Sequence, residues 1–176
     1  MAKTDMERGV WKAPAGLDAA IQGIKGLQFN MNDAQNGFLN PKAVNALRYF
    51  DPAGPVVWGA RTLRGEDAIS DDFKYVPVRR LANYLELSLQ RGTKWAVFEP
   101  NDEQLWSALR ISIGSFLKGL KSQGGILDYQ VICNETTTTP DDQLQGIVNV
   151  WIRYKPVYPA EFVVLQFQIE GVQLSS

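Results

Sequence analysis

The sequence predicts a single domain of the α/β (α+β) class, in which helices pack against a mixed sheet and extended segments flank the domain at both ends. Two periodicities support this class: apolar residues recur at helical spacing in two long segments, and they alternate with polar residues in two segments near the C-terminus. Size agrees, because 176 residues, 45% of them hydrophobic, suit one ordinary globular domain with tails.

The first third of the chain predicts an extended start, a short helix and a strand. Trp11 is costly to leave in water, so the segment around it is expected to lie along a surface of this chain or of a neighbour. A helix is predicted over 40–50, because an asparagine in the cap position precedes a proline in the first helical position. A strand is predicted over 56–62, where Gly59 indicates a bulge or a close backbone approach.

Two longer amphipathic helices are predicted over 78–91 and 101–122, with a short buried strand over 95–98 between them. The pair Asn101 and Gln104 fits a capping box at the start of the second helix. The residues expected on the core faces are Leu81, Tyr84, Leu85 and Leu89, then Leu105, Leu109, Ile113, Phe116, Leu117 and Leu120.

The last third predicts three strands and a short helix capped by Thr139. One strand covers 129–133, and two segments, 147–154 and 162–169, alternate with a period of two. One face of the first alternating segment carries Val148, Val150, Ile152 and Tyr154, and one face of the second carries Val163, Leu165, Phe167 and Ile169. The resulting order of helices and strands gives the mixed sheet of the predicted fold.

Composition argues against several kinds of chemistry. The chain has no histidine, which removes the commonest general base and metal ligand, and its formal net charge is -1, which disfavours sequence-independent nucleic-acid binding. Its one cysteine, Cys133, is expected to be a small buried apolar residue. No apolar run approaches the roughly 20 residues that span a bilayer, so no membrane insertion is expected. The sequence predicts no cofactor, no metal site and no enzyme activity.

The charged residues and the last strand leave alternative interpretations open. The acidic pairs fall in loops or in first turns of helices, where electrostatics alone explains them. Glu161, just before the last apolar run, fits an edge-strand charge or a salt bridge. Arg110, Lys118 and Lys121 gather on one side of their helix, as a solvated face or as a docking surface for an acidic partner. The last strand forms either an edge hairpin or a strand given to another subunit.

Five blocks of sequence resemble the contractile tail-sheath proteins of phages, R-type pyocins and related injection systems. Any one block is weak evidence, but all five occur in the family's order. They are Asn40-Pro41 with Val44-Asn45-Ala46-Leu47-Arg48, Val57-Trp58-Gly59-Ala60-Arg61-Thr62, Tyr75-Val76-Pro77-Val78-Arg79-Arg80-Leu81, Phe98-Glu99-Pro100-Asn101-Asp102 with Leu105-Trp106, and Pro159-Ala160-Glu161-Phe162-Val163.

The resemblance implies a subunit that stacks in rings around an inner tube and contracts to drive the tube through a target envelope. It divides the chain into an extended segment (1–30), a sheath core domain (31–158) and a C-terminal arm strand (159–176). The arm residues expected to join a neighbour's sheet are Phe162, Val163, Val164, Leu165, Phe167 and Ile169. The receiving strand is expected to use Val148, Val150 and Ile152, and Arg110, Lys118 and Lys121 become candidates for contact with the tube.

The implied partners are other sheath subunits, the inner tail-tube protein, and baseplate and terminator proteins, in a particle assembled in a host cytoplasm. Two other hypotheses stay open, a minor sheath-like component at the baseplate or terminator and a small enzyme that uses carboxylates. Sheath proteins usually have several hundred residues, so this chain is expected to lack the outer domains and the N-terminal arm.

Overall fold

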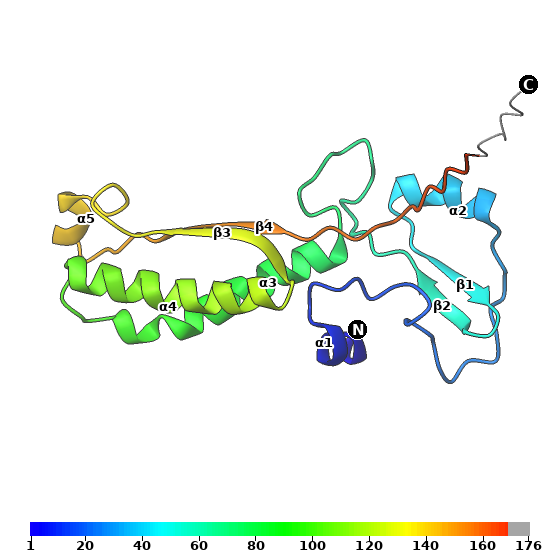
Figure 1. The fold of residues 1–176 in the computed structure, drawn as a ribbon, viewed down its shortest axis with the longest axis horizontal. Helices are drawn as coiled ribbons and strands as arrows, with labels where there is room; N and C mark the ends of the chain where they lie inside the picture. Colours follow the sequence, from blue (N-terminus) through cyan, green and yellow to red (C-terminus); the bar gives the residue numbers. More distant parts are fainter. Residues whose placement is uncertain (169–176) are drawn as a thin grey trace, which may run out of the picture.

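The computed structural model describes residues 1–168 and shows helices packed against short antiparallel strands (Figure 1). The helices are α1 (Ala2–Arg8), α2 (Asp33–Leu39), α3 (Val76–Gly92), α4 (Glu103–Ser122) and α5 (Pro140–Leu144), and the strands are β1 (Ala46–Phe50), β2 (Gly54–Trp58), β3 (Ile126–Ile132) and β4 (Trp151–Pro156). The α+β class is therefore confirmed. Within the described residues the strands form two separate antiparallel pairs, β1–β2 and β3–β4, instead of one mixed sheet.

The larger part of the molecule is a two-layer unit, with α3 and α4 under the β3–β4 pair (Figure 1). Both helices are confirmed, and their apolar stripes meet in one core. This core consists of Leu81, Leu85, Ile113, Leu117, Leu120 and Ile126. Complete burial of one such side chain stabilises the fold by about 1.5–3 kcal/mol, so this cluster is the main source of stability.

The β3–β4 pair confirms the alternation predicted near the C-terminus. Tyr129 lies opposite Tyr154 and Val131 lies opposite Ile152. Along β4 the side chains alternate between exposed and half-buried. The strand begins at Trp151, later than predicted, because residues 147–150 approach the core without forming a ladder. Within the described part of the chain β4 pairs with β3 alone, so its other edge has no strand partner.

A second, smaller unit holds the β1–β2 hairpin at the opposite end of the molecule from α5 (Figure 1). The helix predicted over 40–50 is wrong: a single 3₁₀ turn at Asn40–Lys42 precedes β1. The alternating burial of β1 and its pairing with β2 outweigh the local proline signal, which produces only that turn. The strand predicted over 56–62 is correct only for its first part, since β2 ends at Trp58.

The predicted strand over 95–98 is also wrong, because Lys94–Ala96 form a 3₁₀ turn and Phe98 is fully exposed with φ 71°. The cap of α4 is Asp102, one residue after the predicted Asn101. The Asp102 carboxylate accepts hydrogen bonds from the backbone N–H groups of Gln104 and Leu105. The cap of α5, Thr139, is confirmed with a complete capping box.

The N-terminal segment folds back on this same chain. It contains α1, which the prediction of an extended segment over 1–30 missed, and Asp5 of α1 pairs with Arg80 of α3 at 2.8 Å. Trp11 packs on the core beside Gly125, where a Cβ atom would lie 2.8 Å from the indole ring. Residues 16–21 then run along β2, with hydrogen bonds from Gly16 N–H to Val57 O and from Val57 N–H to Ala19 O.

Candidate assembly interface

The point where the C-terminal segment leaves the body is fixed by a buried ion pair. Arg61 donates two parallel hydrogen bonds to Glu161, from Nε to Oε1 at 2.9 Å and from Nη2 to Oε2 at 2.7 Å. The Arg61 side chain is 1% exposed and that of Glu161 is 15% exposed. This forked geometry combines charge with a fixed orientation, so it sets the position of Glu161 more tightly than a surface pair does. The salt-bridge hypothesis for Glu161 is confirmed.

Three further side chains complete this cluster, which we call the arm clamp: Arg61, Asp67, Lys74, Tyr75 and Glu161. The Tyr75 hydroxyl donates to Glu161 Oε2 at 3.1 Å. Asp67 accepts from Arg61 at 2.8 Å and from Lys74 at 2.6 Å. The cluster therefore holds two carboxylates and two cations, so its buried charges are balanced.

The electrostatics of the clamp favour its ionised form. Burial raises the pKa of the Glu161 carboxyl, but the hydrogen bonds and charge of Arg61, with the Tyr75 hydroxyl, more than offset this and hold the pKa below its ordinary value. Hydrogen bonding to Lys74 first, and then to Arg61, lowers the pKa of Asp67. Both carboxylates therefore stay charged at neutral pH.

The backbone of Arg61 is itself held by Asn45. The Asn45 side chain accepts from the Arg61 N–H at 2.9 Å and donates to the Arg61 carbonyl at 2.7 Å. Gly59 permits this approach, because a Cβ atom there would lie 2.6 Å from Asn45 Oδ1 and 2.9 Å from Asn45 Cα. The close backbone approach predicted at Gly59 is confirmed. Four of the sequence blocks that suggested the family, those of Asn45, Arg61, Tyr75 and Glu161, therefore meet at one place in the fold.

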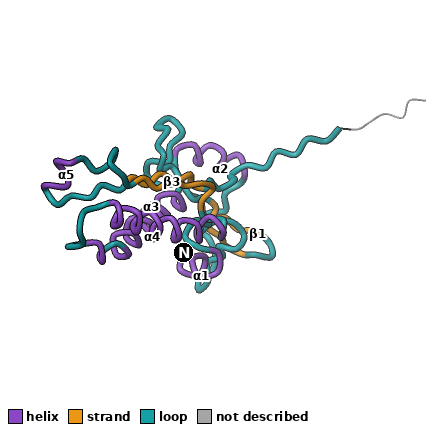
Figure 2. The backbone as a smooth tube through the Cα atoms, turned by 60° about the vertical axis from the view of Figure 1, so that its left-hand side comes forward, coloured by secondary structure: helices purple, strands orange, loops and turns teal. Residues whose placement is uncertain are grey.

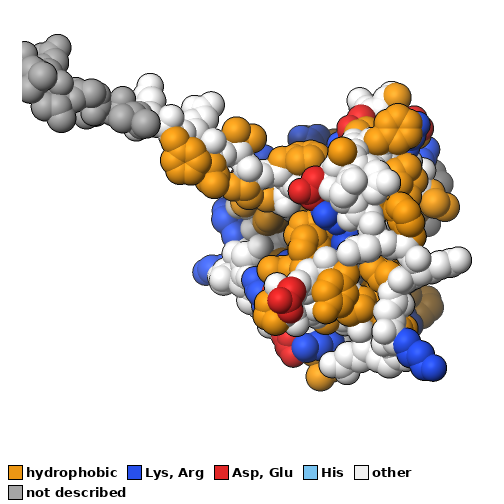
Figure 3. All heavy atoms as spheres, turned by 90° about the vertical axis from the view of Figure 1, so that its right-hand side faces the viewer, with side chains coloured by type: hydrophobic (Ala, Val, Ile, Leu, Met, Phe, Trp, Pro, Cys, Tyr) orange, Lys and Arg blue, Asp and Glu red, His pale blue; other side chains and the backbone are white. Residues whose placement is uncertain are grey.

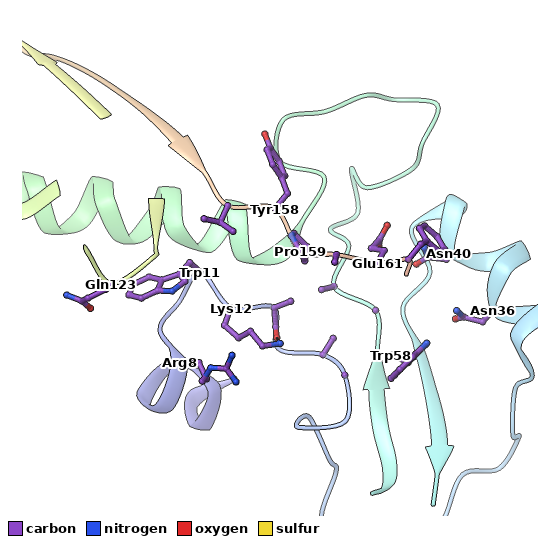
Figure 4. Close-up of a pocket in the computed structure, with 18 residues that line it drawn as sticks. Arg8, Trp11, Lys12, Asn36, Asn40, Trp58, Gln123, Tyr158, Pro159 and Glu161 are labelled. Atoms are coloured by element: carbon purple, nitrogen blue, oxygen red, sulfur yellow. The ribbon is translucent and has the colours of Figure 1, made fainter. Parts of the chain in front are cut away.

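A groove of about 640 Å³ lies beside the clamp, between the N-terminal segment, the end of β2 and residues 157–162. Figure 4 shows Glu161 next to Asn40 on one side of this groove and Trp11 with Gln123 on the other. The predictions from the sequence did not include Arg61, Asp67 or Tyr75 as site residues. Arg61 and Tyr75 do lie inside the recognised sequence blocks, but this position alone does not show which residue each of them binds.

Beyond Glu161 the chain projects from the body as an extended segment (Figure 2). Its predicted interface residues are exposed, from 71% at Phe162 and Leu165 to 87% at Phe167, with Val163 and Val164 between. Apolar side chains follow this segment as it leaves the molecule (Figure 3). Ile169 lies outside the described residues. Exposed apolar side chains in such a row indicate a surface that a partner covers.

The predicted receiving residues Val148, Val150 and Ile152 lie together. All three line a second groove of about 640 Å³, whose other walls include Leu89, Leu109 and Ile113 of the two long helices. This groove lies beside β4, the strand whose second edge is unpaired within residues 1–168. A strand added at that edge would turn alternate side chains toward the groove.

The structure places the three predicted tube-contact cations along one side of α4, with different surroundings. Arg110 bonds to Glu103 and to the carbonyl of Cys133. Lys121 pairs with Asp128 of β3 at 2.7 Å. Lys118 is exposed and has no ion pair among the described residues. Two of the three charges are thus partly neutralised within the chain.

The remaining candidates for chemistry have local structural roles. Burial raises the pKa of the Cys133 thiol, and its side chain is fully buried. Asp102 caps α4, Asp142 completes the capping box of α5 by accepting from the Thr139 N–H, and Asp71 accepts from the backbone N–H of Phe73. Residues 1–168 hold no cluster of three or more potential metal ligands among His, Cys, Asp and Glu. In the same part of the chain no helix has the length and apolar character needed to cross a membrane.

The chain belongs to the phage tail sheath family. The family model described as the phage tail sheath C-terminal domain matches residues 69–170. The tail sheath protein of Enterobacteria phage T4 is 29% identical over 169 residues, which cover 94% of this chain and 25% of that protein. A putative prophage major tail sheath protein of Pseudomonas aeruginosa is 28% identical over 91% of this chain and 41% of its own length.

Solved structures agree in fold. The PVC sheath complex, an extracellular contractile injection system in its contracted state, has a chain that is 38% identical with a TM-score of 0.84, over 95% of this chain and 48% of that one. The contracted helical sheath of the anti-feeding prophage matches at 35% identity and the same TM-score. This chain therefore spans from about a quarter to about half the length of these relatives.

Proposed function

We propose that this chain is a structural subunit of a contractile tail sheath, which stacks in rings around an inner tube and contracts to drive the tube through a target envelope. Family membership and the exposed apolar arm support this proposal together. The relatives are sheath proteins, and the charged residues discussed above take part in helix capping and ion pairs. In this function the subunit works without enzyme activity, in a phage tail or injection particle assembled in a host cytoplasm.

The single observation that carries the proposal is that the same chain has both an extended apolar arm and a strand edge to which such an arm could bind. Residues 162–168 are extended and mostly apolar, and among the described residues β4 has an edge without a strand partner beside an apolar groove. In the proposed assembly the arm of one subunit pairs with β4 of another. Backbone hydrogen bonds then provide affinity, and alternate side chains of the arm, such as Val163, Leu165 and Phe167, fill the groove lined by Val148, Val150 and Ile152.

A contact with the inner tube fits the outer side of α4. Lys118, which has no ion pair within residues 1–168, offers a positive charge there, and Arg110 and Lys121 could exchange their internal carboxylates for those of an acidic partner. Such exposed charges affect the rate and salt dependence of association more than its affinity.

The experiment is a truncation after Glu161, which removes the arm and keeps every residue of the clamp. We expect the truncated chain to fold, as judged by its circular dichroism and cooperative urea unfolding. We also expect that no striated tubes will be visible by electron microscopy when the truncated chain replaces every copy of the full chain. Normal tubes from the truncated chain would refute the arm mechanism.

A second candidate is a minor sheath-like subunit at the baseplate. A chain in the symmetrised baseplate structure of the anti-feeding prophage matches at 35% identity with a TM-score of 0.84. Counting copies per particle separates the two functions, because a baseplate component forms one ring and a sheath subunit forms many.

A further inference from the structure

The arm clamp joins two parts of the chain that are 100 residues apart, and it stands between β4 and the arm. β4 ends at Pro156, and residues 157–160 then pass along the groove beside the clamp without ladder hydrogen bonds. The next residue, Glu161, accepts hydrogen bonds from Arg61 and Tyr75. The first exposed arm residue, Phe162, follows directly. We propose that the clamp is the mechanical joint of the arm: it passes a pull on the arm into the body through Arg61 and Tyr75 and keeps that pull away from β4.

This inference rests on the proposed function, because it needs a neighbour that pulls. In that assembly β4 has two tasks, since it receives one neighbour's arm and continues into the arm held by another. A pull transmitted along the chain would reach β4 at Pro156, the residue opposite Ile126 at the end of the ladder. The hydrogen bonds of an antiparallel pair run perpendicular to the strands, so a pull on the end of β4 would load the same ladder that supports the strand holding the other arm.

The contacts of Arg61 are suited to this load. Its guanidinium binds Glu161 with two bonds at once, and its own backbone is fixed by two bonds from Asn45. The neighbouring backbone is tied to the start of α3, with hydrogen bonds from Val76 N–H to Ala60 O and from Thr62 N–H to Lys74 O. A displacement of Glu161 therefore has to move the hairpin unit and the N-terminal end of α3 together.

The position of the clamp makes a testable distinction between two insertions of Gly-Ser. Placed between Pro156 and Val157, the insertion lengthens the link between β4 and the clamp, and the arm beyond Glu161 keeps its original length. Placed between Glu161 and Phe162, it lengthens the arm by about 7 Å beyond the clamp. If the load instead runs along the chain from β4, the two insertions are equivalent. Both leave all clamp residues unchanged, so neither removes a buried charge partner.

The experiment places each insertion in the native particle, triggers contraction, and counts by electron microscopy the sheaths that contract without breaking. We expect the insertion before the clamp to resemble the wild type and the insertion after it to reduce intact contraction at least tenfold. Glu161→Gln should give the same loss, with Glu135→Gln as a matched control, because Glu135 is exposed in a turn. Equal behaviour of the two insertions, or of Glu161→Gln and Glu135→Gln, overturns the joint.

Failure of the joint and failure of the proposed function give different results. If truncation after Glu161 still permits tube assembly, the arm mechanism itself fails. If that truncation abolishes assembly while both insertions contract normally, the arm mechanism stands and the joint is wrong. Circular dichroism of the purified chains identifies any variant that does not fold. If Glu161→Gln does not fold, the comparison of the two insertions alone tests the joint.

Discussion

Substitution of Gly59 by alanine should destabilise the chain through a contact that involves no charge. The added Cβ would lie 2.6 Å from Asn45 Oδ1 and 2.9 Å from Asn45 Cα, distances well inside van der Waals contact. Because one of these atoms is backbone, rotation of the Asn45 side chain cannot relieve the overlap. The substitution therefore separates Asn45 from Arg61.

The magnitude follows from two contributions. The two Asn45–Arg61 hydrogen bonds, at 2.7 and 2.9 Å, contribute about 1 kcal/mol each. Overpacking by one carbon adds at least about 1 kcal/mol, so the free energy of unfolding should fall by about 3 kcal/mol. For a chain of this size that corresponds to a decrease in Tm of about 6–12 °C.

Urea unfolding followed by tryptophan fluorescence measures this change, and Gly114→Ala is the matched control. Gly114 lies within α4, and a Cβ there meets no atom within 4 Å. Alanine should raise the free energy of unfolding there by up to about 1 kcal/mol, because glycine costs a helix roughly that amount. In an Asn45→Ala background the cost of Gly59→Ala should shrink by about 2 kcal/mol. Equal effects of Gly59→Ala and Gly114→Ala would refute the reasoning.

Three further predictions concern the core, a cap and pH. Leu117→Ala should lower the free energy of unfolding by about 3 kcal/mol, because Leu117 is fully buried, whereas Ile111→Ala on the same helix should change it little, since Ile111 is 70% exposed. Asp102→Ala should cost about 1 kcal/mol by urea unfolding, through loss of the α4 cap. Stability from Glu161, whose pKa is lowered in the folded chain, is fully present above the ordinary pKa that this carboxyl has when unfolded, and it is lost as pH falls through the folded pKa. Urea unfolding from pH 6 to pH 3 should therefore show a smaller loss in Glu161→Gln than in the wild type, and parallel curves would contradict this.

The sequence predicted the elements that carry their own periodicity. α3, α4 and β3 appear where their apolar patterns placed them, and Thr139 caps α5 as expected. These elements bury a face against the rest of the domain, so burial and local propensity agree. The pattern fails at 95–98, where apolar residues occupy an exposed turn, and at 40–50, where proline and asparagine predicted a helix.

The candidate assembly interface was predictable only in part. The arm was visible as a period-two run, because alternation is a local property of the sequence. The clamp was not, because Arg61 and Glu161 are 100 residues apart and no local signal connects them. Glu161 was correctly expected to form a salt bridge, yet its partner emerges only when β2, α3 and the C-terminal segment meet.

The sequence distance across the clamp also determines when the arm acquires its anchor. Arg61 leaves the ribosome 100 residues before Glu161, and helix pairs such as α3–α4 can form from local contacts in the interval. Glu161 emerges after all the elements around its binding place, and the apolar arm follows it directly. The apolar segment is therefore synthesised only after the residues that form its anchor, so the anchor can form before this segment meets neighbouring chains.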